Sequence, residues 1–249
     1  MGADAAVSRE THSPAARVLE GARAMGVELD PATAAALIAL LDRVALEPQN
    51  LTAIDSVHEG VERHLLDSLA GLSLPVVAGA SALVDVGSGA GFPGLALAVA
   101  RPGLAVTLVE SERSKADWLR RASADARNLR VVADRSEHLA SAEREAAPLA
   151  TARALGPLPV ALELTAPLVA VGGAVVLWRG DAADPEVEAV GARAARELGL
   201  EPAEPVAVTP FPGARRRLHV FAKVAPTPPR YPRRPGRAAK RPLGDPPRR

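Results

Sequence analysis

Three glycines at alternate positions follow a short apolar run and form the most informative stretch of the sequence. The run 83–87 leads into Gly89 and Gly91, and Pro93 then opens a predicted helix. Glycine is needed where the backbone takes a positive φ and where a ligand approaches without a Cβ in the way. N–H groups at a helix start suit a polar or anionic group. This stretch predicts a ligand-binding loop, and a glycine turn without a ligand is the less favoured interpretation.

Two kinds of cofactor could bind to such a loop. Gly89, Gly91 and Gly94 match the G-x-G-x-x-G pattern of dinucleotide sites, which alone is a weak signal. The glycines at alternate positions, preceded by Asp85, also match the acidic-x-G-x-G-x-G loop of S-adenosyl-L-methionine-dependent methyltransferases. A carboxylate at Asp85 would repel a pyrophosphate, whereas it would attract a methionyl ammonium and a sulfonium. We therefore favour S-adenosyl-L-methionine over NAD.

The elements expected around this loop alternate between strand and helix. The apolar runs that predict strands are 83–87, 105–110, 130–134, 149–154, 174–178, 205–209 and 218–224. This alternation predicts an α/β fold, a doubly wound and mostly parallel sheet with helices on both faces. The last two runs leave no room for a helix between them, so we expect an antiparallel hairpin at one edge. Glu110 closes the second run and suits a ribose diol with either cofactor.

Helical patterns dominate the chain before residue 75. The patterns cover 14–25, a stretch after the cap Asp30 and the first-turn proline Pro31, and 57–72. They predict a helical N-terminal segment, 14–75, packed on a core of residues 76–225, with a disordered leader at 1–13. In the third pattern, His64 is expected to cap or pack, and Asp67 to anchor the helices to the sheet.

Two segments upstream of the glycine loop make a family resemblance specific. Asn50–Thr52, His64–Ser68 and Asp85–Gly94 together resemble, in order and spacing, the small-subunit ribosomal RNA guanine-N7 methyltransferase G family, also called glucose-inhibited division protein B. The resemblance covers residues 14–224. It implies a class I methyltransferase fold, Rossmann-like with an antiparallel last strand, and methyl transfer to N7 of a guanine in 16S ribosomal RNA.

The same resemblance implies roles for individual residues. Gly87 and Phe92 would line the methionine and sulfonium end of the cofactor site, and Ser136 and Glu137 would hold the adenine end. Arg153 would lie beside the methyl group and the substrate, as a cofactor contact and as the candidate catalytic residue. From the residues alone, the Ser136-Glu137 pair also fits a helix cap with a first-turn acid, and Arg153 fits a surface ion pair.

The residues that are absent bear on the acceptor atom. The chain has no cysteine, which excludes disulfides and the usual cysteine nucleophile of cytosine-C5 methyltransferases. Guanine N7 has an in-plane lone pair and needs positioning more than a general base. No convincing base follows the predicted strands. The resembling family often carries Lys-Gly after the fifth strand, whereas this chain has Arg179-Gly180, which keeps a positive charge for guanine or phosphate.

The C-terminal residues 226–249 differ in composition from the rest. They hold eight Lys and Arg, one acid and eight prolines, a charge balance of +7 that leaves −6 for the remaining chain. So many prolines and charges predict disorder. Such a tail is either a solubilising appendage or an arm that seeks nucleic-acid phosphates.

The overall composition limits location and partners. Acidic and polar residues occupy the N-terminus in place of a signal sequence, and Glu163, Pro167 and the pair Gly172-Gly173 interrupt the longest apolar stretch, 160–178. We therefore expect a cytoplasmic protein with no membrane span. The five histidines show no paired ligand spacing, so no metal is expected. The expected partner is 16S ribosomal RNA or the small ribosomal subunit, and the chain is expected to be a monomer.

Three alternatives from other classes remain. The first is a methyltransferase of the same fold that acts on a small molecule or a protein, which the positive charge of residues 215–217, Arg179 and the tail disfavours. The second is a nicotinamide-dependent oxidoreductase, which Asp85 disfavours. The third is a non-catalytic RNA-binding module, for which an intact cofactor loop would be superfluous.

Overall fold

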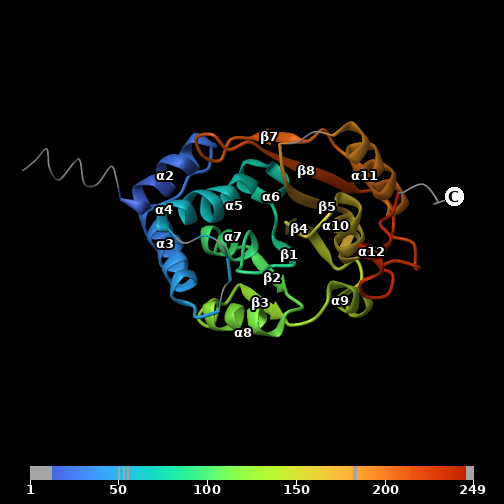
Figure 1. Ribbon diagram of the computed structural model, residues 1–249, viewed down its shortest axis with the longest axis horizontal. Helices are drawn as coiled ribbons and strands as arrows, with labels where there is room; N and C mark the ends of the chain where they lie inside the picture. The colour runs from blue at the N-terminus through green and yellow to red at the C-terminus, as the bar shows by residue number, and fades with distance from the viewer. Residues whose placement is uncertain (1–12, 50, 53, 55, 182–183, 245–249) are drawn as a thin grey trace, which may run out of the picture.

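An eight-stranded mixed sheet forms the centre of the molecule in the computed structural model (Figure 1). The structure describes residues 13–49, 51–52, 54, 56–181 and 184–244. The strand order is β3-β2-β1-β4-β5-β8-β6, and β7 pairs with β8 off this path. The strands are β1 (Ala82–Val86), β2 (Ala105–Val109), β3 (Leu129–Val132), β4 (Ala147–Arg153), β5 (Val169–Gly180), β6 (Leu200–Pro202), β7 (Val206–Val208) and β8 (Arg216–Lys223).

The directions of the strands confirm the predicted architecture. The strands β1 to β5 pair in parallel, whereas β8 pairs antiparallel with β5, β6 and β7. The pairing of β7 with β8 is the antiparallel hairpin expected at this edge. The strand β6 was not predicted, because its residues Leu200, Glu201 and Pro202 form no apolar run. All carboxyl ends of the parallel strands meet at one edge, which Figure 1 shows facing the viewer.

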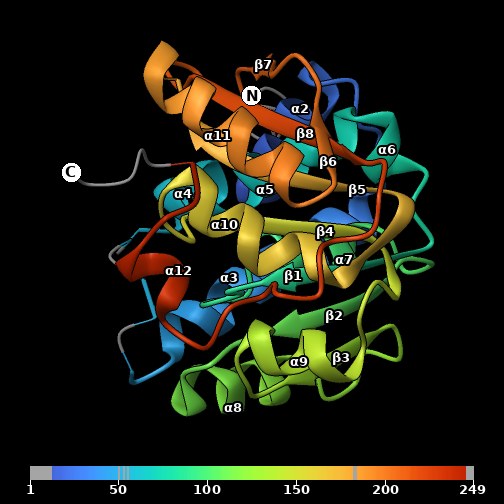
Figure 2. The ribbon, with the colours of Figure 1, turned by 90° about the vertical axis from the view of Figure 1, so that its right-hand side faces the viewer.

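Helices cover both faces of the sheet (Figures 1 and 2). The N-terminal helices pack with α7 and α8 into one apolar cluster, whereas α9, α10 and α11 contribute to clusters on the other face. The helices of more than four residues are α2 (Pro14–Ala24), α3 (Pro31–Leu46), the π-helix η1 (Val61–Leu66), α7 (Gly94–Ala100), α8 (Arg113–Ala122), α9 (Ser136–Ala142), α10 (Leu158–Thr165) and α11 (Pro185–Glu197). The shorter ones are α4 (Val57–Gly60), α5 (Asp67–Leu69), η2 (Ala70–Ser73), α6 (Pro75–Ala78), η3 (Ala166–Leu168) and α12 (Arg237–Lys240). None of these described helices combines the length and the apolar character that a membrane span requires.

The same local signal starts three of these helices. Ser13, Asp30 and Asp184 each precede a proline, and each side chain accepts a hydrogen bond from a backbone N–H of the first turn. The proline lacks the N–H that would remain unpaired at that position, and its fixed φ suits the helix. The starts of α2 and α3 therefore follow directly from the sequence.

The helical N-terminal part differs in detail from the prediction. The single helix expected at 57–72 is divided into α4, the π-helix η1, α5 and the 3-10 turn η2. Pro75, expected to end the helical part, begins α6 instead, because proline is favoured in a first helical turn. The π-helix spans His64, and α5 begins at Asp67, two residues that face the functional site described below.

The prediction of disorder for the C-terminal residues was wrong for residues 226–244, which we call the C-terminal strap. The strap packs against α9, α10 and α11, and its own side chains of Tyr231, Ala238 and Leu243 are buried in this contact. In Figure 2 it runs from the end of β8 to α12, which lies at the edge toward which the parallel strands point. Composition favoured disorder, whereas a few apolar anchors and buried ion pairs fix this segment. The expected leader lies almost wholly outside the described residues, as do residues 245–249.

Candidate functional site

The glycine loop follows β1 at the carboxyl edge of the sheet. Gly87, Gly89 and Gly91 have φ values of +72°, +54° and +106°. The N–H of Gly87 donates to the carbonyl of Val109, at the end of β2, over 2.9 Å. A Cβ on Gly87 would lie 2.6 Å from Cδ1 of Leu155, the residue that follows β4 by two positions. The loop therefore needs glycine both for its backbone conformation and for its close approach to the end of β4.

Asp85 supports this loop from beneath. Its side chain is 1% exposed, and it accepts hydrogen bonds from Thr151 Oγ1 at 2.8 Å and from the N–H of Gly94 at 3.2 Å. Burial raises the pKa of Asp85, and these hydrogen bonds act in the opposite direction. From the sequence this carboxylate is expected against the cofactor, whereas its described contacts lie within the protein, where it ties the loop to β4. The N–H of Gly94 at the start of α7 also donates to Asp85, so it is already paired within the protein.

Glu110 approaches the loop from the end of β2. Its Oε2 accepts from the N–H of Gly89 at 2.9 Å, and its Oε1 accepts from the N–H of Glu112 at 2.8 Å. Each carboxylate oxygen can accept a further hydrogen bond. Glu110 is thus held rigidly beside the loop with capacity left for the hydroxyls of a ribose.

Phe92 and His64 stack face to face beside the loop. Their ring centroids are 4.5 Å apart with an interplanar angle of 4°. Burial, followed by the nearby charge of Arg153, lowers the pKa of His64 to about 4. The neutral ring accepts at Nδ1 from Arg153 over 3.4 Å, so Nε2 carries the proton and donates to Thr52 Oγ1 over 3.0 Å.

Arg153 ends β4 and is fixed by several acceptors. Its Nη1 donates to the carbonyl of Arg63 at 2.8 Å and to Oδ2 of Asp67 at 2.7 Å. The other oxygen of Asp67 accepts from Nε of Arg216, at the start of β8, over 2.8 Å. Asp67 is 4% exposed. One buried carboxylate therefore holds two guanidinium groups, one from the end of β4 and one from the start of the antiparallel β8, at the same edge of the sheet.

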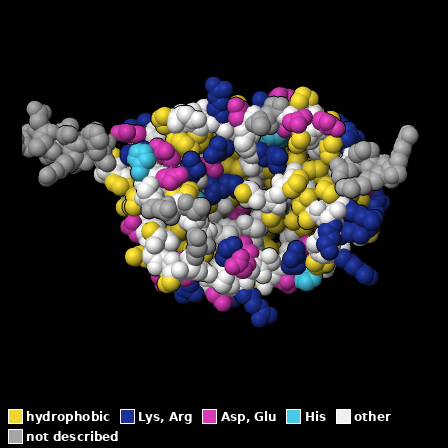
Figure 3. All heavy atoms as spheres, viewed as in Figure 1, with side chains coloured by type: hydrophobic (Ala, Val, Ile, Leu, Met, Phe, Trp, Pro, Cys, Tyr) yellow, Lys and Arg dark blue, Asp and Glu magenta, His cyan; other side chains and the backbone are white. Residues whose placement is uncertain are grey.

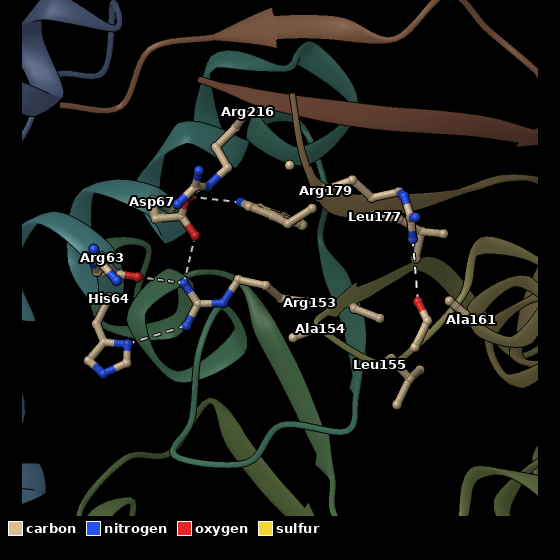
Figure 4. A pocket seen from close by; sticks show the side chains of 14 residues that line it. Arg63, His64, Asp67, Arg153, Ala154, Leu155, Ala161, Leu177, Arg179 and Arg216 are labelled. Atoms are coloured by element: carbon tan, nitrogen blue, oxygen red, sulfur yellow. Dashed lines mark hydrogen bonds and ion pairs between the residues drawn. The ribbon is translucent and has the colours of Figure 1, made fainter. Parts of the chain in front are cut away.

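A pocket of about 460 Å³ opens between this cluster and Arg179, which Figure 4 shows on the other side. Cavities of this size accept a small molecule or a single base. Leu155 and Trp178 also line it, and the Trp178 indole N–H donates to the carbonyl of Asp67 at 2.7 Å. The ionisable side chains that line it are Arg63, His64, Asp67, Arg153, Arg179 and Arg216. Because Leu155 faces both Gly87 and this pocket, the pocket and the glycine loop are neighbours.

Ser136 and Glu137 lie apart from this pocket, at the start of α9. Both side chains are buried. Glu137 pairs with Arg135, with 3.5 Å between Oε2 and Nε, and its Oε1 accepts from the N–H of Gly236 in the C-terminal strap at 3.3 Å. The predicted adenine end is therefore bordered by the C-terminal strap, a segment whose composition predicts disorder.

The sequence did not predict His64, Asp67 or Arg216 as residues of the site. His64 and Asp67 were expected to pack and to anchor, and their separation by three residues, which places them on one helix face, was the available signal. Arg216 lies in a run of three arginines, and nothing in the sequence distinguishes it from its two neighbours as a site residue. Arg179, named as a departure from the family pattern, lines the pocket and donates to the carbonyl of Gly156 at 3.3 Å. Asn50 lies outside the described residues.

Among the residues that the structure describes, no three His, Asp or Glu side chains gather as a metal site would require. The strand order and the glycine loop after β1 together define a class I S-adenosyl-L-methionine-dependent methyltransferase fold. Fibrillarin of Methanococcus jannaschii, a pre-rRNA processing protein, has the same fold. It aligns with a TM-score of 0.51 at 15% identity over 64% of this chain and 74% of its own.

The sequence comparisons identify the family. The family model of rRNA small subunit methyltransferase G matches residues 33–210. Ribosomal RNA small subunit methyltransferase G of Symbiobacterium thermophilum is 38% identical over 237 residues, 90% of this chain and 96% of its own length. That of Deinococcus radiodurans is 40% identical over 240 residues, 93% and 94% of the two chains. The chain belongs to the rRNA small subunit methyltransferase G family, which confirms the resemblance.

Proposed function

We propose that this chain transfers the methyl group of S-adenosyl-L-methionine to N7 of a guanine in 16S ribosomal RNA, either free or within the small ribosomal subunit. The relatives named above are ribosomal RNA methyltransferases. The observation that carries the choice of acceptor atom is the pairing of Asp67. Among the described residues that line the pocket it is the only carboxylate, and both of its oxygens accept from arginines. The described lining of the pocket thus offers no free carboxylate base, which suits an acceptor that loses no proton.

The residues around the glycine loop fit S-adenosyl-L-methionine. The loop keeps space that a Cβ at Gly87 would fill, and Glu110 retains acceptor capacity for a ribose. We assign Gly87, Gly89 and Phe92 to the methionine and sulfonium end, with Asp85 fixing the loop from below. The adenine end is assigned to Ser136 and Glu137 at the start of α9. When bound, this cofactor supplies a methyl group activated by a positive sulfur.

The proposed transfer needs no proton acceptor. The lone pair of guanine N7 forms the new N–C bond as the C–S bond breaks, and the electrons of that bond remain on sulfur. The positive charge passes from sulfur to the guanine ring. The chain's task is to hold N7, the methyl carbon and sulfur in line, and such positioning accounts for a large part of many rate enhancements.

The arginines of the pocket are suited to hold the acceptor nucleotide. Arg153 and Arg216 are oriented by Asp67, and Arg179 by the carbonyl of Gly156. Each guanidinium keeps N–H groups free to donate to guanine O6 or to a phosphate. The neutral His64 beside Phe92 adds no further positive charge next to a base that becomes cationic. Arg153 is therefore assigned as the catalytic positioning contact to the substrate.

Mapping of N7-methylguanine in 16S ribosomal RNA tests the proposal. We expect one modified guanine in cells that carry the gene and an unmodified base at the same position after its deletion. The purified chain should restore the mark on isolated small subunits or on deproteinised RNA in the presence of S-adenosyl-L-methionine. The two substrates compared side by side show which form is used, and the cytoplasmic location of the subunit gives the proposed site of action.

A chain carrying Gly87→Val serves as the control for cofactor dependence. Methylation of a protein or of a small molecule, with the ribosomal RNA left unchanged, would contradict the proposal and favour the alternative of the same fold.

A further inference from the structure

We propose that the C-terminal strap is a docking surface for the phosphate backbone of RNA, beside the entrance to the methyl-transfer site. The inference rests on the proposed function and adds the surface on which the substrate lies. It concerns a segment beyond residue 210, where the family match ends.

The strap is anchored firmly enough to present side chains at fixed positions. Arg144 donates to the carbonyls of Thr227 and Tyr231 at 2.6 and 2.7 Å. Arg233 pairs with Glu163 of α10, whose side chain is 1% exposed, with 2.8 Å between Nε and Oε1. These contacts hold the strap against the helices along most of its length.

The end of the strap lies at the carboxyl edge of the sheet. The N–H of Gly236, which precedes α12, donates to Glu137 at the start of α9. Since α9 follows β3, this contact fixes α12 on the side where the glycine loop and the arginine pocket open. Figure 3 shows Lys and Arg side chains in the central hollow and a second group over α12 at the right of the same face.

The charges of the strap divide into two groups. Arg230 forms an exposed ion pair with Glu197, and Arg233 forms the buried pair with Glu163 that anchors the strap. Arg234, Arg237, Lys240 and Arg241 are exposed, and within the described residues none of the four forms an ion pair. Because Ala238 is buried, the side of α12 that carries Arg237 and Lys240 faces outward. A group of exposed cations on an anchored segment of an otherwise acidic chain matches a polyanionic backbone.

The apolar side chains of the strap decide between RNA and an anionic membrane. A peripheral membrane segment inserts apolar groups beside its cations. Tyr231, Ala238 and Leu243 are all buried against the protein, so these groups are not available for insertion. These charges also lie on the face of the molecule at which the glycine loop and the arginine pocket open. Both observations favour RNA.

Two matched double variants of the full chain test the assignment. Arg234→Gln/Arg237→Gln removes two exposed charges of the strap. Arg127→Gln/Arg196→Gln removes two exposed charges beside the start of β3 and at the end of α11, on the opposite edge of the sheet. Binding to a 16S ribosomal RNA transcript is measured over a range of salt concentrations. Two lost phosphate contacts should lower the slope of log K against log salt by about 1.4 to 1.8 in the strap variant. The control variant should keep the wild-type slope.

Further measurements separate this inference from the proposed function. The affinity for S-adenosyl-L-methionine should stay within about twofold of wild type in both variants. Equal salt slopes for the two variants, with methyl transfer by the wild-type chain intact, would overturn the strap assignment alone. A wild-type chain that methylates no guanine would overturn the proposed function together with it. Strap-dependent binding to vesicles of phosphatidylglycerol, with RNA binding unchanged, would assign the surface to a membrane and contradict the inference.

Discussion

Asp67 connects the two arginines of the pocket through a single buried carboxylate. Arg153 and Arg216 each contribute a charged hydrogen bond of 2.7 to 2.8 Å to it. Removing one partner of a buried ion pair usually leaves an unpaired charge, which is costly. Here the second arginine remains, so a change at Arg153 can be made without leaving Asp67 alone. The function of Arg153 can therefore be tested apart from its contribution to folding.

The first prediction concerns Arg153. We expect Arg153→Ala to keep S-adenosyl-L-methionine affinity within a few-fold and to lose methyl transfer by roughly 10² or more, since the reacting pair is no longer held in line. Arg153→Lys should recover only part of the rate, because an ammonium cannot reproduce two parallel donors. Titration calorimetry gives the affinity, and transfer of labelled methyl to small subunits gives the rate.

Other outcomes would reassign this residue. A loss of cofactor affinity before any loss of rate would place Arg153 at the methionine carboxylate, and Arg179 would then be the next candidate for the RNA contact. Normal turnover of Arg153→Ala on ribosomal substrate would remove the residue from the site.

The second prediction concerns Gly87. We expect Gly87→Val to abolish cofactor binding, because the backbone has a φ of +72° and an added Cβ would lie 2.6 Å from Leu155. Gly103→Val is the matched control, since a Cβ there meets nothing within 4 Å. Circular dichroism checks that both variants are folded. Unchanged affinity in a folded Gly87→Val chain would contradict the assignment of the loop.

At the scale of whole elements, the C-terminal strap shows where composition misleads. Prolines lack an N–H, so an extended segment rich in proline leaves few backbone donors unpaired when it lies against helices outside the sheet. Its anchors come from Arg144 and Glu163, 70 or more residues earlier in the chain. Counting charges and prolines within the segment gives no sign of these distant partners.

The third prediction concerns the ion pair that anchors the strap. We expect Arg233→Ala to lower the free energy of unfolding by about 3 kcal/mol, because Glu163 would keep a buried charge without its partner. Arg230→Ala is the matched control on the same strap. Its pair with Glu197 is exposed, so a loss of less than about 1 kcal/mol is expected. Urea unfolding measures the free energy of unfolding of both variants. Equal losses would contradict the expectation that the buried pair stabilises the protein more than the exposed pair.

The sequence predicts the strands and the ends of strands better than it predicts contacts between them. β1, β2 and β4 follow from apolar runs bounded by Gly or Pro, and parallel pairing then gathers their carboxyl ends at one edge. This suffices to bring together the glycine loop, Glu110 and Arg153. The choice of Asp67 as the common partner of two arginines depends on packing between distant elements, and no local pattern encodes it.

At the scale of the whole molecule, two histidines make stability depend on pH. His64 lies beside the pocket, and His219 lies in β8. Burial, followed by nearby arginines, lowers the pKa of each to about 4. In the unfolded chain both take up protons near pH 6.5. At these two sites the unfolded state therefore binds more protons than the folded state between these two values, and protonation of either histidine favours unfolding there.

The fourth prediction follows from this difference. We expect the free energy of unfolding to be at its full value above pH 6.5 and to fall as the pH decreases toward 4. Each histidine should contribute about 2 to 3 kcal/mol at the lower limit. His64→Gln and His219→Gln should each reduce the slope. His138→Gln, which removes an exposed imidazole, is the control, and urea unfolding at a series of pH values gives the slopes. A wild-type slope retained by both buried-site variants would contradict the assignment.

The shared carboxylate at Asp67 also has a consequence for the order in which the chain is made. Its two partners are synthesised later, Arg153 by 86 residues and Arg216 by 149. Translation proceeds from the N-terminus, so the pocket cannot be assembled until both strands that carry these arginines have emerged. A growing chain still attached to its ribosome thus passes most of its synthesis beside ribosomal RNA without an assembled pocket for it.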